Sequence, residues 1–239
     1  IDAGCAPLAL VETQTTRGMF GAMRHLPRAM FGAATLLKGL GLIAKIRRAG
    51  VPRYTAASDF RATAERNGDI RFSFRVAAEA RSLNCGLLLT HQGVVPGTHI
   101  TRAAGIAHSW NKDQGAYQPE CDRWGATNQP GLHIAGDGAG IGGAEAAAAA
   151  GELTALNILS QLGKCDADAR DQRAARPRAA LFRARAIRPF LDAAYAPPAE
   201  FHAPADDTIV CRCEEVSAGA VRQAIGEGPH GHRQIKTSL

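Results

Sequence analysis

A glycine-rich loop between an apolar segment and an alanine-rich segment constrains this chain most strongly. Residues 132–135 predict a short strand, and residues 144–162 predict a helix. Between them lies the pattern G-x-G-x-x-G, formed by Gly138, Gly140 and Gly143. In such a loop the backbone amides approach a phosphate closely, and the end of the following helix adds partial positive charge. The pattern therefore predicts an α/β protein with a nucleotide-type ligand at the carboxyl end of a strand.

This loop does not belong to the usual first nucleotide-binding unit. That unit continues into a second strand with an acidic residue about 20 residues after the loop, whereas residues 166–180 here are charged and helical. Instead, Asp137 ends the strand itself, where a carboxylate can accept a hydrogen bond from a sugar-alcohol hydroxyl. The alternative is a tight turn with Asp137 as a simple helix cap. Four glycines within residues 138–143 favour ligand binding, because they cost backbone entropy that a plain turn need not carry.

The element resembles the second flavin motif of the glutathione-reductase-like flavoproteins, in which a strand ending in Gly-Asp binds the ribitol of FAD. That resemblance implies that Asp137 holds the ribitol chain. It also implies that the surrounding backbone lines the flavin and the pyrophosphate, at Gly136, Gly138, Gly140, Ile141, Gly142, Gly143 and Ala144. The loop HQGVVPG at residues 91–97 is similar to the segment that returns from the pyridine-nucleotide-type domain to the FAD domain. His91 is either close to the flavin or, as we favour, an ordinary loop histidine.

The amino-terminal segment offers a second candidate nucleotide ligand. Residues 6–12 (APLALVE) predict a buried strand that ends in Glu12. The second strand of a nucleotide-binding unit carries its ribose-binding acid at this position. Glu12 is therefore a candidate for binding a second adenine nucleotide, and the alternative is an ordinary carboxylate at a strand end.

Between these sites the pattern predicts one long helical segment and several strands. Apolar residues at helical spacing predict helix over residues 19–48, kinked near Pro27 and stopped by Gly50. Asn67-Gly68 predicts a hairpin turn. Leu87, Leu88 and Leu89 are apolar on both faces and predict the centre of a sheet. The predicted strands are residues 51–54, 58–64, 69–76 and 80–90.

Two of the six cysteines form a pair near the carboxyl end. Cys211 and Cys213 follow a short predicted strand at residues 208–210, and Ser217 predicts the cap of a helix ending at Gly226. Two thiolates at this spacing can serve one metal, and an iron–sulfur cluster uses four. A zinc site or an inert pair of thiols are the alternatives. The other cysteines are scattered singly, which fits a reducing cytoplasm better than a secreted scaffold.

The string CRCEEV resembles the [2Fe–2S] domain of the bacterioferritin-associated-ferredoxin type, which opens Cys-x-Cys-Glu-Glu-Val and closes with a second cysteine pair downstream. The resemblance implies that Cys211 and Cys213 bind the cluster and that its remaining ligands lie outside this chain. The first residue is Ile1 rather than Met, and the last is Leu239, inside the interval before the second pair. We therefore expect a fragment, and the alternative is a domain that has lost its metal.

Charge and hydropathy restrict the classes of partner. Many of the basic residues behind the net charge of +6 lie in residues 170–188, where no aromatic platform is interleaved with the arginines. This arrangement indicates a solvated basic helix and not a nucleic-acid surface. We expect that no apolar run reaches the roughly 18–20 residues that a transmembrane helix needs. We expect a soluble cytoplasmic protein, with peripheral attachment to the inner face of a membrane as the alternative.

In combination, these motifs resemble the large (A or alpha) subunit of opine oxidases, the related B subunit of hydrogen cyanide synthase, and dye-linked proline or hydroxyproline dehydrogenases. The resemblance covers essentially all 239 residues. It implies part of a fold with two dinucleotide-binding domains, a helical linker and the start of a small iron–sulfur domain. The implied divisions are a pyridine-nucleotide-type domain, the carboxyl-terminal part of an FAD domain, a helical and proline-rich linker, and a [2Fe–2S] domain, at residues 1–90, 91–163, 164–205 and 206–239.

The resemblance also implies the function. A partner subunit, a flavoprotein of the amino-acid-oxidase type, would bind and oxidise an opine, amino acid or related amine, and this chain would relay the electrons through FAD and the cluster. The chemistry is then that of the cofactors, and we assign no catalytic acid, base or nucleophile to this chain. The alternatives are a stand-alone NAD(P)H-dependent flavin reductase and a non-enzymatic metal- or redox-sensing module.

Overall fold

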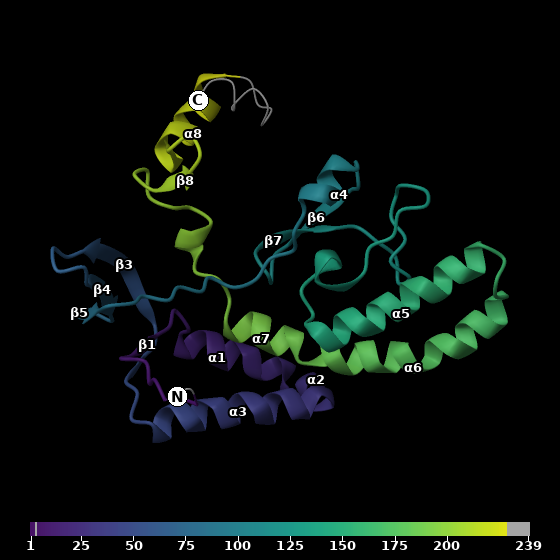
Figure 1. Cartoon of the computed structure of the whole chain (residues 1–239), viewed down its shortest axis with the longest axis horizontal. Helices are drawn as coiled ribbons and strands as arrows, with labels where there is room; N and C mark the ends of the chain where they lie inside the picture. Colours follow the sequence, from purple (N-terminus) through teal and green to yellow (C-terminus); the bar gives the residue numbers. More distant parts are fainter. Residues whose placement is uncertain (3, 229–239) are drawn as a thin grey trace. The chain divides into compact units, whose positions relative to one another are not determined.

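The computed structural model describes residues 1–2 and 4–228. Its internal contacts divide the chain into two units, Ile1–Ala196 and Pro197–Leu239. The division falls within residues 164–205, which the resemblance implies to be a helical and proline-rich linker. Both units combine helices with strands (Figure 1).

The first unit opens with two short parallel strands joined by a helical crossover. Strand β1 (Leu10–Val11) pairs with β2 (Arg53–Tyr54). The connection contains α1 (Thr16–Ala22), α2 (Leu26–Ala29) and α3 (Ala33–Arg48), separated by the short 3₁₀ turns Met23–His25 and Met30–Gly32. The predicted helical segment and its interruption near Pro27 are confirmed, since Pro27 lies in the first turn of α2. Parallel strands need such a crossover, because a tight hairpin can join only antiparallel strands.

The helical segment Thr16–Arg48 corrects our expectation about membrane-spanning length. By length and composition it could cross a membrane, since an 18-residue window has a mean hydropathy of 1.5 and only 6% of that window is buried. The chain runs out along α1 and returns along α3 (Figure 1). The amide of Glu12 donates to the carbonyl of Tyr54 over 2.8 Å, which holds the two ends of the crossover together. A single crossing would separate these ends by about 30 Å, so it is incompatible with the pairing of β1 and β2.

An antiparallel sheet follows, formed by β3 (Ala57–Ala64), β4 (Ile70–Val76) and β5 (Glu79–Cys85). The predicted turn at Asn67-Gly68 is confirmed, with Gly68 at φ +88°. The predicted strand over residues 80–90 is wrong beyond Cys85. Leu87 and Leu89 lie outside any strand and are 73% and 83% exposed, because no strand pairs with this segment in the part of the chain that the structure describes.

The next elements lead to the glycine loop. They are α4 (His99–Ala103) and the antiparallel strands β6 (His108–Asn111) and β7 (Ala116–Pro119). The predicted strand at residues 132–135 does not form, and a single antiparallel bridge joins His133 to Ala126 instead. One bridge cannot propagate a ladder, so the segment enters the loop as irregular backbone. Within the described residues β1–β2 is the only parallel pair, so a fold with two dinucleotide-binding domains stays a prediction.

Three helices complete the first unit: α5 (Ala144–Gln161), α6 (Ala167–Ala186) and α7 (Arg188–Ala194). The predicted alanine-rich helix is confirmed as α5, and it packs along α6 through a core of Trp124, Leu153, Leu156 and Ala174. Arg170 and Arg178 place their guanidinium carbons 4.4 and 4.5 Å from the centre of the Trp124 ring. The basic segment is therefore partly a packing surface, and its aromatic partner Trp124 lies outside the segment's own sequence.

The second unit is small. It contains the 3₁₀ turn Ala199–Phe201, the antiparallel strands β8 (Ile209–Cys211) and β9 (Val216–Ser217), and α8 (Ala218–Glu227). The predicted cap is confirmed, since the hydroxyl of Ser217 accepts a hydrogen bond from the amide of Ala220 over 3.2 Å. Ile225 on α8 is 46% exposed. Residues 229–239, the last part of the predicted iron–sulfur domain, lie outside the described residues.

Candidate functional site

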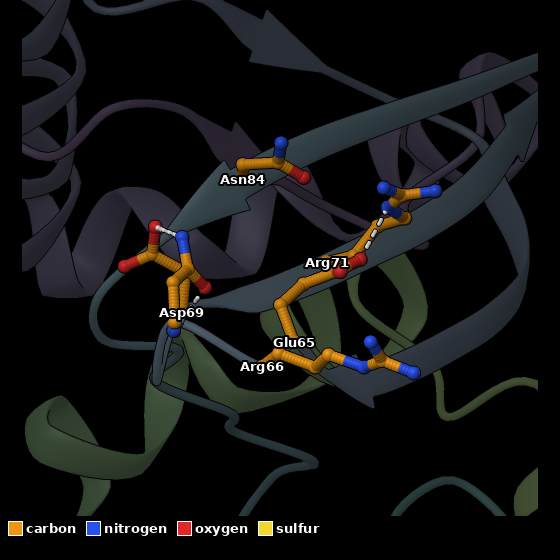
Figure 2. Close-up of a pocket in the computed structure, with 6 residues that line it drawn as sticks. Glu65, Arg66, Asp69, Arg71 and Asn84 are labelled. Carbon is orange, nitrogen blue, oxygen red and sulfur yellow. Dashed lines mark hydrogen bonds and ion pairs between the residues drawn. The ribbon is translucent and has the colours of Figure 1, made fainter.

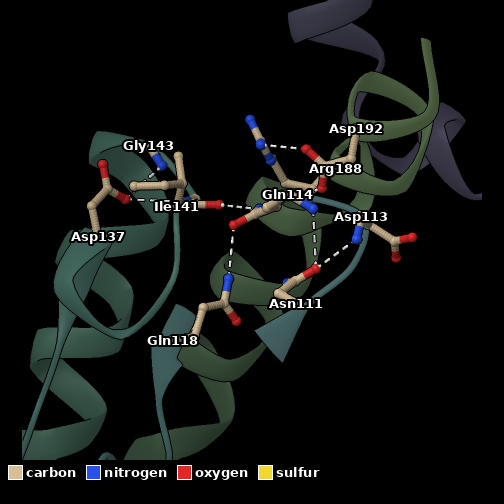
Figure 3. Close-up of polar contacts among 10 residues, drawn as sticks. Asn111, Asp113, Gln114, Gln118, Asp137, Ile141, Gly143, Arg188 and Asp192 are labelled. Atoms are coloured by element: carbon tan, nitrogen blue, oxygen red, sulfur yellow. Dashed lines mark hydrogen bonds and ion pairs between the residues drawn. The ribbon is translucent and has the colours of Figure 1, made fainter. Parts of the chain in front are cut away.

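The carboxylate of Asp137 organises the glycine loop at the amino end of α5. Asp137 lies in the 3₁₀ turn Gly136–Ala139. Its Oδ1 accepts hydrogen bonds from the amides of Gly142 and Gly143, each over 2.9 Å (Figure 3). These two bonds lower the pKa of Asp137 below its ordinary value, and the positive charges of Arg188 and Arg185 lower that pKa further. The loop therefore keeps a negative charge on Asp137.

Only one oxygen of this carboxylate is occupied. Both hydrogen bonds end on Oδ1, and Oδ2 accepts none from the residues that the structure describes. The side chain is partly exposed. Asp137 thus has the geometry of a cap, as in the alternative interpretation, and still presents a free acceptor to a ligand hydroxyl. Capping and ligand binding are compatible at this residue.

The glycines of the loop serve two different purposes. Gly136 and Gly143 have φ values of +74° and +89°, a region that side chains disfavour. A Cβ on Gly142 would come within 2.8 Å of the Ala146 Cβ, so this glycine lets the loop lie close against α5. A Cβ on Gly143 would meet nothing within 4 Å. Beside the amino end of α5 there is therefore open space at Gly143, whose amide is bonded to Asp137.

These features fit the end of an FAD site as the sequence predicts it. The loop offers an anionic acceptor and open space, and the helix end carries partial positive charge. Gly138 also faces space, with Ile134 Cγ2 at 3.9 Å from a Cβ built there. The residues of this chain can thus contact a ribitol hydroxyl and an anionic or electron-rich group.

Two glutamines, which sequence reasoning missed, connect the loop to neighbouring elements. The side-chain amide of Gln114 donates to the Ile141 carbonyl over 3.3 Å and to Asp192 Oδ2 over 3.4 Å (Figure 3). Its oxygen accepts a hydrogen bond from the Gln118 amide over 2.7 Å. The glycine loop is therefore tied both to the β6–β7 hairpin and to α7. No local sequence pattern indicates this link, because its members are far apart along the chain.

The Asp192 carboxylate at the end of this link is half-buried. It forms an ion pair with Arg188 one helical turn earlier on α7. Burial raises the pKa of Asp192 above its ordinary value, and the neighbouring Arg188 opposes that rise. Burial and pairing at this carboxylate therefore act in opposite directions on its charge.

The structure gives Glu12 and His91 local partners. Glu12 lies just after β1 and forms an ion pair with Arg53 on β2, whose guanidinium also donates to Gln14 Oε1 over 3.1 Å. The hydrogen bond to Glu12 raises the pKa of Arg53 above its ordinary value. Nδ1 of His91 accepts a hydrogen bond from the amide of Gly93 over 3.3 Å. Neither side chain has a hydrogen bond or ion pair with the glycine loop among the described residues, so no polar contact joins the predicted candidates.

The two candidate metal ligands lie in the second unit. Cys211 ends β8 and pairs with Val216 of β9, and Cys213 is exposed in the turn between these strands. Both are free thiols. Among the described residues, no group of three or more His, Cys, Asp or Glu side chains is placed to hold a metal. The two thiols can contribute part of a metal site, and the rest of a four-ligand site has no counterpart in this part of the chain.

Comparison with known proteins aligns nearly the entire chain with proteins named as A subunits of opine oxidase. No family model matches it. It is 37% identical over 238 residues to the A subunit of opine oxidase from Agrobacterium tumefaciens (strain Ach5). The aligned residues make up 99% of this chain and 47% of that protein. The chain is similar to part of an opine oxidase. A second protein of the same name, from Rhizobium meliloti (strain 1021), is 37% identical over 241 residues, or 100% of this chain and 52% of the relative.

A more distant similarity links the chain to another enzyme. Hydrogen cyanide synthase subunit HcnB of Pseudomonas aeruginosa is 29% identical over 221 residues, which cover 87% of this chain and 47% of that protein. The chain spans about half the length of the curated relatives it matches. These relatives are named as subunits of an oxidase or a synthase.

Proposed function

We propose that this chain is part of an FAD-dependent oxidoreductase subunit that relays electrons from the oxidation of an opine, amino acid or related amine. Its partner would be a second flavoprotein subunit, of the amino-acid-oxidase type, that binds the substrate. Support comes from the similarity to the A subunit of opine oxidase and to HcnB. The structural observation that carries the proposal is the free Oδ2 of Asp137 beside the open amino end of α5.

In this proposal the residues of the chain bind and orient the cofactor. Asp137 would hold a ribitol hydroxyl through Oδ2 while Oδ1 keeps the loop folded. The backbone from Gly138 to Ala144 would line the flavin and the pyrophosphate. Bound FAD would supply the electron-transfer chemistry. Placing a helix amino end at such a cofactor favours negative charge there.

The test is the flavin content of the full-length protein that contains this chain. We expect Asp137→Asn, which keeps the shape of the side chain, to weaken FAD binding about tenfold, because a charge-assisted hydrogen bond contributes roughly 1.5–3 kcal/mol. Asp166→Asn is the matched control, since Asp166 caps α6 through a similar bond to the amide of Ala169. Wild-type protein without flavin, or an Asp137→Asn variant that binds FAD as tightly as wild type, would overturn the proposal.

A [2Fe–2S] cluster in the second unit is the second part of the proposal. Cys211 and Cys213 would supply two of its ligands, and the others would come from outside this chain. In full-length protein, we expect Cys211→Ser and Cys213→Ser each to remove the bound iron, while Cys121→Ser leaves the iron content unchanged. Iron that persists in both of the first two variants would exclude these cysteines as ligands.

The partner and the location are also parts of the proposal. A cytoplasmic complex is supported by the six free thiols of the chain. We expect an artificial dye to be reduced by an opine or amine only when both proteins are present. Turnover in the absence of the partner would refute the assignment of substrate binding to it. The ion pair of Glu12 with Arg53 leaves the alternative of an NAD(P)H-dependent reductase without a supporting structural observation.

A further inference from the structure

A small cavity adjoins the glycine loop on the side of the two glutamines. Its volume is about 240 Å³, and its wall comes from α2, the β6–β7 hairpin, the loop itself, α6 and α7. Arg28, Arg185 and Arg188 line it from three different helices. Asp113 and Asp192 are the acidic residues of the lining. The cavity therefore gathers positive charge beside residues 139–141 of the loop.

Two of the three positive charges of this cavity lack an acceptor within the described residues. Arg28 and Arg185 form no ion pair or hydrogen bond within the described residues. Arg188 forms an ion pair with Asp192, but its Nε is buried and has no acceptor in that same part of the chain. A buried donor without an acceptor is costly and uncommon in folded proteins. The cavity thus offers two guanidinium groups without an acceptor among the described residues, and of its own two carboxylates Asp192 is paired with Arg188.

Size and charge narrow the class of ligand. A volume of about 240 Å³ lies below the range of roughly 300–1,000 Å³ that is typical of drug-sized ligands, so a dinucleotide does not fit. Guanidinium groups bind both carboxylate and phosphate in a bidentate manner. Asp113 and Asp192 repel the two charges concentrated on one dianionic phosphate group more strongly than the single charge of one carboxylate group, because repulsion grows with the product of the charges. In a dicarboxylate the second charge lies on a separate group, which can be farther from these two residues. A small organic carboxylate is the better match.

We propose that this cavity binds a small organic carboxylate, held by the guanidinium groups of Arg28 and Arg185. Gln114 joins the cavity to the Ile141 carbonyl of the loop (Figure 3). The ligand would therefore bind beside the candidate flavin site and not within it. The inference goes beyond the proposed function, since it rests on the cavity and its arginines whether or not flavin binds at Asp137.

The larger recess of the first unit does not have these properties. Its volume is about 440 Å³, and it lies at the tip of the β3–β4 hairpin (Figure 2). Glu65 and Arg71 in its wall are already paired over 2.7 Å. Asn67 and Asp69 bond to each other. This recess therefore contains no comparable set of unpaired donors among the described residues.

The test is calorimetric titration of the full-length protein with succinate at low ionic strength. We expect saturable binding, weakened about tenfold or more in Arg185→Gln and in Arg28→Gln. Arg183→Gln is the matched control, because Arg183 lies on the same helix as Arg185 but does not line the cavity. Its affinity should stay within about twofold of wild type. Succinamide, which has the shape of succinate without the charges, should not bind.

Several outcomes would overturn the inference. The inference fails if succinate does not bind to the wild-type protein. It also fails if the Arg183→Gln control loses as much affinity for succinate as the Arg28→Gln and Arg185→Gln variants. Phosphate binding more tightly than succinate would reject the carboxylate class. Arg28 is exposed, so Arg28→Gln tests the site even if Arg185→Gln fails to fold. Asp137→Asn should leave succinate binding intact, which separates a failure of the flavin proposal from a failure of this one.

Discussion

Loss of the Asp137 carboxylate should release the glycine loop in a measurable way. In Asp137→Ala, the amides of Gly142 and Gly143 lose an acceptor at 2.9 Å. Each hydrogen bond to a charged group contributes roughly 1.5–3 kcal/mol. The two bonds share one oxygen of a partly exposed side chain, so we take about 2 kcal/mol for their joint contribution to closing the loop. This corresponds to about 30-fold faster amide exchange of the loop.

Hydrogen exchange of peptides covering residues 136–146 in the full-length protein measures this opening. Asp137→Asn keeps a neutral acceptor and should lose only about half of the roughly 2 kcal/mol that closes the loop. Its amide exchange should therefore be roughly fivefold faster than in the wild type. Asp166→Ala is the control, since it removes a similar bond at the amino end of α6 and should leave the loop unchanged. Unchanged exchange in Asp137→Ala would refute the role that we assign to this carboxylate, with or without flavin.

Three further variants or conditions test the packing around the loop. Trp124→Ala should lower the free energy of unfolding by about 3–5 kcal/mol in urea denaturation, because the 6%-exposed ring packs in the α5–α6 core; a loss below about 1 kcal/mol would contradict that packing. Gly125→Ala should lower the free energy of unfolding by about 2 kcal/mol or more, because φ is +80° and a Cβ would lie 2.4 Å from the Ile134 carbonyl oxygen. A midpoint of thermal denaturation equal to that of the wild type would contradict this expectation. The stabilisation from Asp137 should be complete above the ordinary carboxyl pKa of about 3.9 and should disappear as the pH falls through the lower pKa of the folded protein; loss of loop protection already at about pH 5–6 would contradict the sign of that shift.

Local sequence signals predicted the elements that depend on few neighbours. The alanine-rich helix α5, the break near Pro27 and the turn at Asn67-Gly68 follow from helical propensity, from the missing amide of proline and from the backbone freedom of glycine. The cap by Ser217 was also predictable, because a hydroxyl before a short apolar helix has a local acceptor role. These features need only the residues next to them.

Features that depend on distant neighbours escaped prediction. Leu87 and Leu89 have the composition of a central strand, but a strand also needs partners, and none pairs with them within the described residues. The same applies to residues 132–135. Trp124 lies beside two arginines that follow it much later in the sequence, and Gln114 contacts a carboxylate even further along the chain. In the candidate site, Asp137 and its glycines were found from sequence, whereas the glutamine link and the arginine-lined cavity were not.

The pairing of β1 with β2 has a consequence for the order of folding. Its partners, Leu10 and Arg53, are far apart in the sequence, whereas Ala64 and Ile70 of the β3–β4 hairpin are close neighbours along the chain. Closing the longer loop costs about 1.7 kcal/mol more in chain entropy for a flexible chain. Two residues per strand provide little hydrogen bonding against that cost. The hairpin should therefore form early, and the parallel pair should form only after α1 to α3 have shortened the distance that the chain must close.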